Sequence, residues 1–584
     1  MSLELLAPAG SPEALDAAVG EGADAVYLGL KNFNARLRSA NFTYARFEGA
    51  LKALRRMGRK LYVTVNTVFE QREADRVYQL LRYLAGLGPD GLIVQDFGVA
   101  AMAKEFPSLR LHASTQMNIA SARGANALSG YGLSRIVLAR ELGLEEIRGI
   151  RAGTNMELET FVHGALCVSA SGLCLFSSYL GGKSANRGIC TQACRRLYRS
   201  GDEEGYFFSP ADLQLLERVP DLAAAGVNSL KIEGRMKSAG YVGAVVRAYR
   251  QVIDALGGTE EEMRRCIDRG KKILDGDFAR AKTEFYFNTA AGEITAPEGT
   301  VSWLDPRQDG GTGISLGRIL EVRGTGDARR GLITEGRAVP GPGDTLRFHR
   351  ADDSNRRSLR ITTAAEGPVF QTVDEDGGTG AAGRTGAAGL WIPVPDGFGK
   401  GDGVYLIQTR AMAKRYAPLL SRQGEGTGRV PGRERAPQLA FPPFPAKPVP
   451  GTGKRGSGGT ERNLPEGIYA QISRIEDMYI LQSARPERCL LNYSRKTVSA
   501  LLAGGKGPLP FKPAEIVLVL DPFFPQAAEG TMAEEIAGLM ERGYHQFVVN
   551  NPGHFSLFRP RHPVLIAGPY LYVFNRWAAS VVAS

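Results

Sequence analysis

Long apolar stretches are missing from this sequence of 584 residues. Nowhere do about 18 uncharged apolar residues follow one another, the length that suggests a membrane-spanning helix. The N-terminal segment MSLELLAPAGSPEALDAAV also lacks a basic region followed by an apolar one, the mark of a signal peptide. We therefore predict a cytoplasmic protein that makes no contact with a membrane.

Histidine is scarce as well, with six residues in the chain. The H-E-x-x-H motif of a zinc protease helix and the G-x-S-x-G turn of a serine hydrolase are both absent. No iron triad of two histidines and one carboxylate occurs with a recognisable spacing. These absences leave a protease hypothesis without a nominated nucleophile, and they leave the oxygen donor of any hydroxylation unidentified.

What the sequence does contain is a surplus of positive charge. Lysine and arginine number 72 against 61 aspartates and glutamates, which gives a formal net charge of +11. A basic protein suits a polyanionic partner such as RNA, although a well-solvated basic surface explains the charge equally simply. We take RNA as the expected partner and the plain surface as the alternative.

Eight short apolar segments alternate with helical patterns over the first 256 residues. Between them apolar residues recur at three- and four-residue spacing, as in PEALDAAVGEGA, which is typical of amphipathic helices. Eight strands with helical crossovers in this length predict an α/β fold, a TIM-like (β/α)8 barrel, with a doubly wound open sheet as the alternative. The predicted strands span 3–8, 24–30, 60–66, 90–95, 110–115, 134–139, 157–164 and 228–234.

Polar residues follow most of the predicted strands. Because the catalytic face of such a barrel lies at the carboxyl ends of its strands, we expect them to meet there, although each alone is equally explained as a solvated loop residue. They are Asn66, Gln95, Asp96, Ser114, Gln116, Arg140, Glu141, His163, Glu233 and Arg235. We nominate His163, Glu233 and Arg235 as catalytic residues. Asn66 and Gln116 are the nominated substrate contacts.

Four of the six cysteines, Cys167, Cys174, Cys190 and Cys194, gather in an insertion at 164–208, after the seventh predicted strand. Their C-x6-C-x15-C-x3-C spacing contains only one tight pair, whereas structural zinc sites usually have two. An iron-sulfur cluster tolerates wider spacing. The spacing alone leaves open an iron-sulfur cluster, a zinc site, and free or redox-active thiols. Cys266 and Cys489 are expected to be buried apolar residues.

Three arginines, Arg195, Arg196 and Arg199, follow the last of these cysteines. We nominate Arg195 and Arg196 in particular for contact with RNA phosphates. Ion pairs with carboxylates of the barrel are the structural alternative.

Five sequence blocks in this order resemble the U32 family, whose members were first named as peptidases and collagenases. The resemblance covers about 250 residues. The blocks are LLAPAGSPEALDAAVGEGADAVYLG, LHASTQMNIAS, ELETFVHGALCVSASGLC, NRGICTQACRRLY and LKIEGRMKSAGYV. The resemblance implies that Cys167, Cys174, Cys190 and Cys194 hold a [4Fe-4S] cluster. Four thiolate ligands leave such a cluster no open iron, so it would act as an electron conduit that needs an electron donor, as a redox gate, or as a clamp for the loop.

The same resemblance implies an RNA-modifying enzyme that hydroxylates C5 of a pyrimidine. The extended chain is similar to the branch of the family that acts on a cytidine of 23S ribosomal RNA. Hydroxylation of tRNA uridine and a collagenase-like peptidase activity are the alternatives. Relatives of the tRNA branch are associated with prephenate, so Glu233 and Arg235 would either orient a carboxylated cosubstrate or pair with each other. Because a pyrimidine must be unstacked before an enzyme reaches C5, we expect a pocket with amide or aromatic readers at the barrel mouth.

The remaining half of the chain reads as appended units. We place the barrel at 1–290, a β-rich small-barrel domain at 298–420, where short strands alternate with glycine turns, and a linker at 421–465. After the linker, apolar segments such as EIVLVLDPFF repeat the pattern of the first barrel. About five strands occur there, so 466–584 is predicted to be a partial, degenerate second barrel. Its open edge needs cover from the first barrel or another chain, and a truncated sequence is the alternative.

Overall fold

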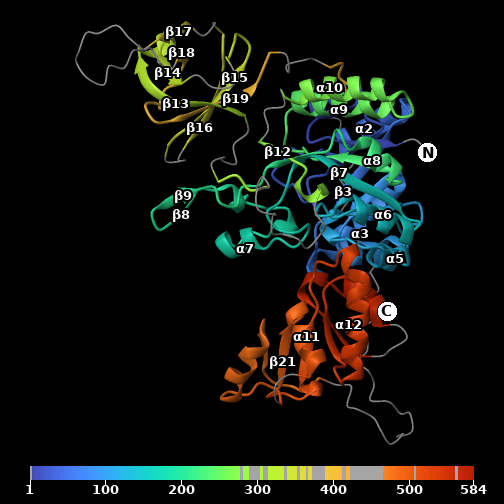
Figure 1. The fold of residues 1–584 in the computed structure, drawn as a ribbon. Coiled ribbons are helices and arrows are strands. Elements are labelled where there is room, and N and C mark those ends of the chain that lie inside the picture. The colour runs from blue at the N-terminus through green and yellow to red at the C-terminus, as the bar shows by residue number, and fades with distance from the viewer. Residues whose placement is uncertain are drawn as a thin grey trace, which may run out of the picture.

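Within the described residues, the computed structural model contains three large sheets, each at the centre of its own unit, and one two-stranded ribbon (Figure 1). The described residues are 3–275, 280–288, 303–306, 313–334, 339–351, 355–362, 366–370, 388–410, 416–420, 464–504, 508–558 and 563–583. Within these ranges, no helix combines the length and the apolar character needed to cross a membrane.

Eight parallel strands of the ten-stranded first sheet close into a barrel. They are β1 (Glu4–Pro8), β2 (Ala25–Gly29), β3 (Lys60–Val65), β4 (Gly91–Val94), β5 (Leu111–Ala113), β6 (Leu133–Val137), β7 (Glu157–Ala165) and β11 (Ser229–Ile232). Neighbours pair in chain order, and β11 pairs in parallel with both β1 and β7, which completes the ring. The predicted (β/α)8 barrel is therefore confirmed, and the open doubly wound sheet is excluded.

Helices cover the outside of the barrel. In several of them the residue just before the first turn caps the N-terminus with its side chain. Ser11, Thr43, Ser121 and Ser238 each accept a hydrogen bond from a backbone N–H of the first turn, which satisfies a donor that the helix leaves free. The helices are α1 (Pro12–Gly20), α2 (Tyr44–Arg56), α3 (Ala74–Leu87), α4 (Phe97–Ala103), α5 (Ala122–Ser129), α6 (Leu144–Gly153), α8 (Val219–Ala224) and α9 (Ala239–Asp254), and α10 (Glu260–Leu274) packs on α9.

The insertion between β7 and β11 carries the four clustered cysteines. It contains α7 (Phe176–Gly181), a two-stranded ribbon of β8 (Tyr198–Ser200) and β9 (Glu203–Gly205), and β10 (Asp212–Gln214). Strand β10 runs antiparallel to the end of β7 and so returns the chain to the barrel, and β12 (Lys282–Thr283) pairs with it. In Figure 1 the insertion projects from one side of the barrel, between the two appended units.

The second sheet is antiparallel and curls around its own apolar core, as expected of a β-rich unit. Leu316, Ile333, Phe348 and Val404 are among its fully buried side chains. In sheet order its strands are β16 (Arg356–Arg360), β15 (Thr345–His349), β19 (Gly403–Gln408), β13 (Ile314–Arg323), β14 (Arg330–Thr334), β18 (Ala388–Pro393) and β17 (Glu366–Phe370).

The third sheet has five parallel strands, the number expected for the partial second barrel. They are β20 (Tyr469–Ile472), β21 (Arg488–Asn492), β22 (Ile516–Val519), β23 (Gln546–Val549) and β24 (Val564–Ala567), with α11 (Arg495–Ala503), α12 (Glu529–Glu541) and α13 (Arg576–Val582). We call 464–583 the C-terminal unit. Its α13 packs against α4 of the barrel, and its segment Pro552–Phe558 packs against α5.

The domain boundaries proposed from the sequence stay a prediction. The linker at 421–465 lies outside the described residues except for Leu464 and Pro465.

Candidate functional site at the barrel mouth

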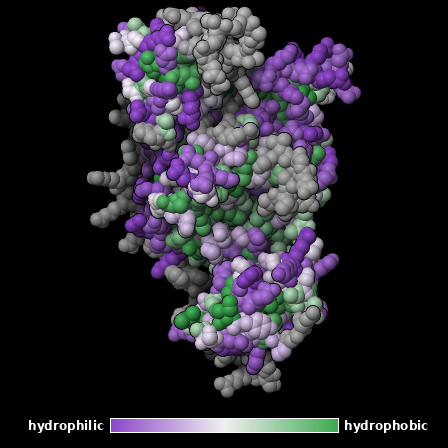
Figure 2. Space-filling model, turned by 60° about the vertical axis from the view of Figure 1, so that its left-hand side comes forward, coloured by the Kyte–Doolittle hydropathy of each residue, from purple (hydrophilic) through white to green (hydrophobic). Residues whose placement is uncertain are grey.

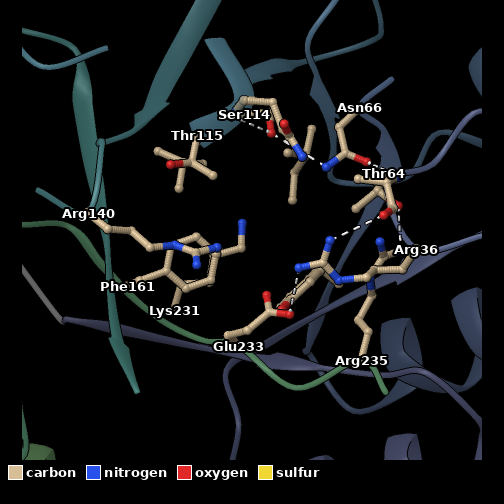
Figure 3. A pocket seen from close by; sticks show the side chains of 15 residues that line it. Arg36, Thr64, Asn66, Ser114, Thr115, Arg140, Phe161, Lys231, Glu233 and Arg235 are labelled. Carbon is tan, nitrogen blue, oxygen red and sulfur yellow. Dashed lines mark hydrogen bonds and ion pairs between the residues drawn. The ribbon is translucent and has the colours of Figure 1, made fainter. Parts of the chain in front are cut away.

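A strongly cationic pocket opens at the carboxyl ends of the barrel strands (Figure 3). It contains about 410 Å³ of space not filled by atoms, part of it open to solvent. Its lining includes four basic side chains, Arg36, Arg140, Lys231 and Arg235, and one carboxylate, Glu233. We call it the cationic pocket. An excess of positive charge with little solvent access favours an anionic ligand.

Glu233 is held as a carboxylate by the basic residues around it. Its Oε1 lies 3.2 Å from Nη2 of Arg36. Burial alone would raise the pKa of Glu233, but Arg36, Arg140 and Arg235 outweigh it and lower the pKa below its ordinary value. Glu233 is therefore charged at neutral pH, and it pairs with Arg36 rather than with Arg235, the partner considered from the sequence.

Arg235 reaches the same pocket from the loop after β11. The side chain is buried, and its Nη1 donates a hydrogen bond of 2.9 Å to Oγ1 of Thr64 on β3. Burial lowers the pKa of Arg235 to about 10, so the guanidinium remains charged at neutral pH. A buried, oriented guanidinium beside open space is suited to a planar carboxylate.

Two further cations are fixed by aromatic rings. The Arg140 guanidinium lies 4.3 Å from the centre of the Phe161 ring, and its Nη1 donates to the Ala165 carbonyl at 2.9 Å. The Lys231 ammonium lies 4.7 Å from the Tyr27 ring centre and 2.6 Å from Oε1 of Glu159. The Phe161 ring attracts the Arg140 guanidinium without neutralising it, so that charge stays available to the pocket. Lys231 is instead held by an ion pair with the buried Glu159 carboxylate.

Both nominated substrate contacts, Asn66 and Gln116, line the cationic pocket. The side-chain Oδ1 of Asn66 accepts a hydrogen bond from the Ala35 N–H at 3.1 Å, and its Nδ2 lies 3.5 Å from the Ser114 hydroxyl oxygen. The backbone N–H of Gln116 donates to the same hydroxyl oxygen at 3.2 Å. The predicted meeting of polar strand-end residues therefore occurs for these positions and for Glu233 and Arg235.

His163 does not line the cationic pocket. It is buried on β7, with its ring centre 5.6 Å from that of Tyr249 and 6.0 Å from that of Tyr241, both on α9. In a regular strand His163 would share a face with Phe161, which does line the pocket. The register between β7 and β11 shifts at this point, so the alternation is broken and the imidazole packs against the outer helix.

The two nominated arginines of the insertion occupy different environments. Arg195 is buried and donates to the Ser209 hydroxyl at 3.0 Å, to the Leu166 carbonyl at 3.0 Å, and to the Pro210 carbonyl. These bonds hold the insertion together, which places Arg195 inside it rather than on the surface. Arg196 is exposed.

The outer surface of the insertion combines apolar and basic side chains. Leu175, Tyr179, Leu180 and Leu197 are all exposed large side chains, with Tyr179 at 85%. Figure 2 shows apolar surface across the middle of this side of the molecule, between its upper and lower parts. Exposed aromatic and basic groups together are typical of surfaces that bind single-stranded nucleic acid.

The four clustered cysteines are half-buried free thiols that interact with one another. A hydrogen bond from Cys174 lowers the pKa of Cys167 to about 6 and raises that of Cys174. Burial raises the pKa of Cys194, and the charges of Cys167 and Cys190 raise it further. All four thiols therefore lie within electrostatic reach of one another.

No group of three or more His, Cys, Asp or Glu side chains in the described ranges is arranged to hold a metal ion. A four-iron cluster makes a different demand, because each thiolate binds its own iron at a corner of a larger object. Four neighbouring thiols in a glycine-rich loop fit that donor set. Of the other two cysteines, Cys489 is buried as expected, whereas Cys266 is half-buried, with Nη2 of Arg269 at 3.2 Å from its sulfur.

Sequence patterns did not point to several residues of the pocket. Arg36 lies in the loop after β2, seven residues beyond the end of the first quoted block. Lys231 stood inside a predicted strand, where a lone charged residue in an otherwise apolar segment was the available signal. Thr64 and Tyr27 occupy buried strand positions that look like ordinary core.

The architecture defines a class of protein, a TIM-type barrel with a cationic pocket at its mouth and a four-thiol insertion beside it. The model of the family described as "Peptidase family U32" matches residues 10–296, and the chain belongs to this family. The family predicted from the five sequence blocks is confirmed.

Three relatives illustrate the range of activities named in the family. The 23S rRNA 5-hydroxycytidine C2501 synthase of Escherichia coli (strain K12) is 37% identical over 306 residues, 50% of this chain and 46% of that protein. The tRNA hydroxylation protein P1 of Bacillus subtilis (strain 168) is 38% identical over 266 residues, 43% of this chain and 63% of that protein. A collagenase of Porphyromonas gingivalis is 34% identical over 315 residues, 50% of this chain and 75% of that protein. The chain thus matches about half to two thirds of the length of the first two.

Proposed function

We propose that this protein is an RNA-modifying enzyme that hydroxylates C5 of a pyrimidine at the mouth of its barrel. The observation that carries the proposal is the cationic pocket beside four interacting thiols, on the face where barrels of this type do chemistry. Two of the relatives are named for hydroxylation of rRNA or tRNA. A cytidine of 23S ribosomal RNA is the substrate we favour, and a tRNA uridine is the second choice.

A peptidase is the competing function, because one relative is named a collagenase. The described residues that line the cationic pocket include hydroxyl side chains but neither a histidine nor a cysteine. Its hydroxyls therefore have no imidazole beside them to act as a base, and the pocket offers a poor route to a serine or threonine nucleophile. This chemistry favours RNA modification.

The identity of the modified RNA is tested by deleting the gene and analysing nucleosides from purified 23S rRNA and tRNA by mass spectrometry. We expect one 5-hydroxypyrimidine to disappear and to return when the intact gene is supplied. Unchanged nucleosides in both RNAs, together with cleavage of denatured collagen by the purified protein, would replace the proposal with the peptidase.

We further propose that Cys167, Cys174, Cys190 and Cys194 hold one [4Fe-4S] cluster. When bound, this group would supply one-electron redox chemistry beside the cationic pocket. The chain's own contribution is to hold the four thiols on a loop fixed to the barrel. Arg195 helps to do so, since it ties the Leu166 carbonyl to Ser209 across the insertion.

Iron and sulfide analysis of anaerobically purified protein tests the cluster directly. Replacing any one of the four cysteines with alanine should abolish or sharply reduce the visible absorption, because each thiolate binds its own iron. Cys266→Ala and Cys489→Ala are the matched controls and should keep the colour. A colourless wild-type protein with stoichiometric zinc would contradict the cluster.

The anion that the pocket receives is proposed to be a carboxylated cosubstrate, with prephenate as the candidate. Arg235 is already oriented by Thr64, and Arg36, Arg140 and Lys231 add charge around the same space. Guanidinium groups bind carboxylates at two points, which fixes their orientation as well as their position.

Arg235→Lys tests this assignment. Lysine keeps the charge but loses the planar two-point contact, so we expect the folded protein to form roughly tenfold less hydroxypyrimidine, since a hydrogen bond to a charged group contributes about 1.5–3 kcal/mol. Arg148→Lys, at an exposed ion pair with Glu145, is the control and should be fully active. Full activity of Arg235→Lys would show that Arg235 does not bind the carboxylate of a cosubstrate.

A further inference from the structure

A second pocket lies where the C-terminal unit meets the mouth of the barrel. One wall consists of residues that follow β4 and β5, among them Gln95 and Asn118, and the other includes Asn550, Tyr570 and Tyr572 of the C-terminal unit. It contains about 390 Å³ of space not filled by atoms, part of it open to solvent. We call it the amide pocket.

The amides of this pocket are buried without hydrogen-bond partners among the described residues. Gln95 is 4% exposed and Asn118 is 3% exposed, and in both the side-chain nitrogen and oxygen lack a partner. The Oδ1 atom of Asn550 lacks one as well, although its Nδ2 donates to the Leu520 carbonyl at 2.9 Å. Buried amides are normally paired, so this concentration of unused donors and acceptors indicates a polar ligand.

Aromatic residues complete the amide pocket. Phe97, Tyr570 and Tyr572 line it, and the two tyrosine rings stand nearly perpendicular with their centres 6.3 Å apart. Amides that hydrogen-bond an edge and rings that stack on a face are the two means by which proteins bind an unpaired base.

The amide pocket adjoins both the cationic pocket and the cysteine insertion. Gln116 lines both pockets. Tyr572 donates a hydrogen bond of 2.8 Å to the carbonyl of Gly172, and the following residue, Leu173, lines the amide pocket directly before Cys174. At Gly172, where φ is +79°, a side chain would overlap the Gln116 carbonyl, so the insertion sits directly on the loop after β5.

We infer that the amide pocket receives the target pyrimidine of the RNA after that base has left its stack, an inference that rests on the proposed function. The donors and acceptors of Gln95 and Asn118 match the mixed donor and acceptor edge of a pyrimidine. A base held there lies next to Gln116, the residue shared with the cationic pocket. The C-terminal unit then takes part in substrate recognition, because it supplies one wall of the pocket.

The test uses Gln95→Met, which keeps the size of the side chain and removes both polar atoms. The control, Gln79→Met, makes the same change on α3, outside the lining of either pocket, where the Nε2 of Gln79 is also buried without a partner. Binding is measured for short single-stranded RNAs that differ in one central base, a pyrimidine or a purine, and for free cytidine. Thermal unfolding of each variant is recorded in parallel.

We expect Gln95→Met to bind the pyrimidine RNA roughly tenfold more weakly and to bind the purine RNA with unchanged affinity. The variant should unfold at the same or a higher temperature, because an unpaired buried amide has been removed. Gln79→Met should bind like the wild type. If Gln95→Met binds both RNAs like the wild type and unfolds at a lower temperature, the inference is overturned. The Gln95 amide then serves packing or holds a bound water. Free cytidine binding as tightly as the RNA would also overturn it, in favour of a nucleoside site.

The nucleoside analysis of the deletion strain separates this inference from the proposed function. If the hydroxypyrimidine disappears on deletion but Gln95→Met binds RNA normally, the inference fails and the function stands. If no nucleoside changes but Gln95→Met loses pyrimidine binding, the base site stands and hydroxylation fails.

Discussion

A network of buried charges inside the barrel ties its strands to one another. Nη1 of Arg135 on β6 lies 2.6 Å from Oε1 of Glu4 on β1 and 3.1 Å from Oε2 of Glu159 on β7. Glu159 also forms an ion pair with Lys231 on β11. Burial of Glu4 opposes ionisation, but Arg135 and Lys60 outweigh it and lower its pKa to about 2. Removing one member would leave a buried charge uncompensated, so the strands are tied together in one arrangement. Lys231 belongs both to this network and to the cationic pocket, which links the core of the barrel to the charge at its mouth.

The C-terminal unit is hydrogen-bonded to the loops at the mouth of the barrel. Asn575 donates to the carboxylate of Asp96 at 3.1 Å and to the Phe69 carbonyl, and the Asn551 amide donates to the Asn118 carbonyl at 3.0 Å. These contacts are made to the loops that follow β3, β4 and β5. The unit packs on the mouth of the complete barrel, where it forms one wall of a pocket.

Much of this architecture was predictable, because strands of a parallel barrel are short, apolar and regularly spaced. All eight strands were located to within a few residues, and the cysteine insertion was placed after the correct strand. The positions of individual side chains were harder to predict. The outward direction of His163 depends on a register shift that no sequence pattern marks, and the burial of Arg195 depends on backbone carbonyls that the fold brings to it. The roles of Arg36 and Gln95 depend on neighbours distant in sequence, so they emerge only from the closed barrel and the docked C-terminal unit.

The central claim is that chemistry on RNA takes place at the barrel mouth, between the cysteine insertion and the C-terminal unit. Photo-crosslinking tests it most directly, with 23S ribosomal RNA or tRNA carrying a photoreactive thiopyrimidine and the purified full-length protein, followed by identification of the linked peptides. The account predicts links to peptides containing Gln116, Leu173 or Tyr570. Links confined to α9 and α10, or to the antiparallel sheet, would contradict it.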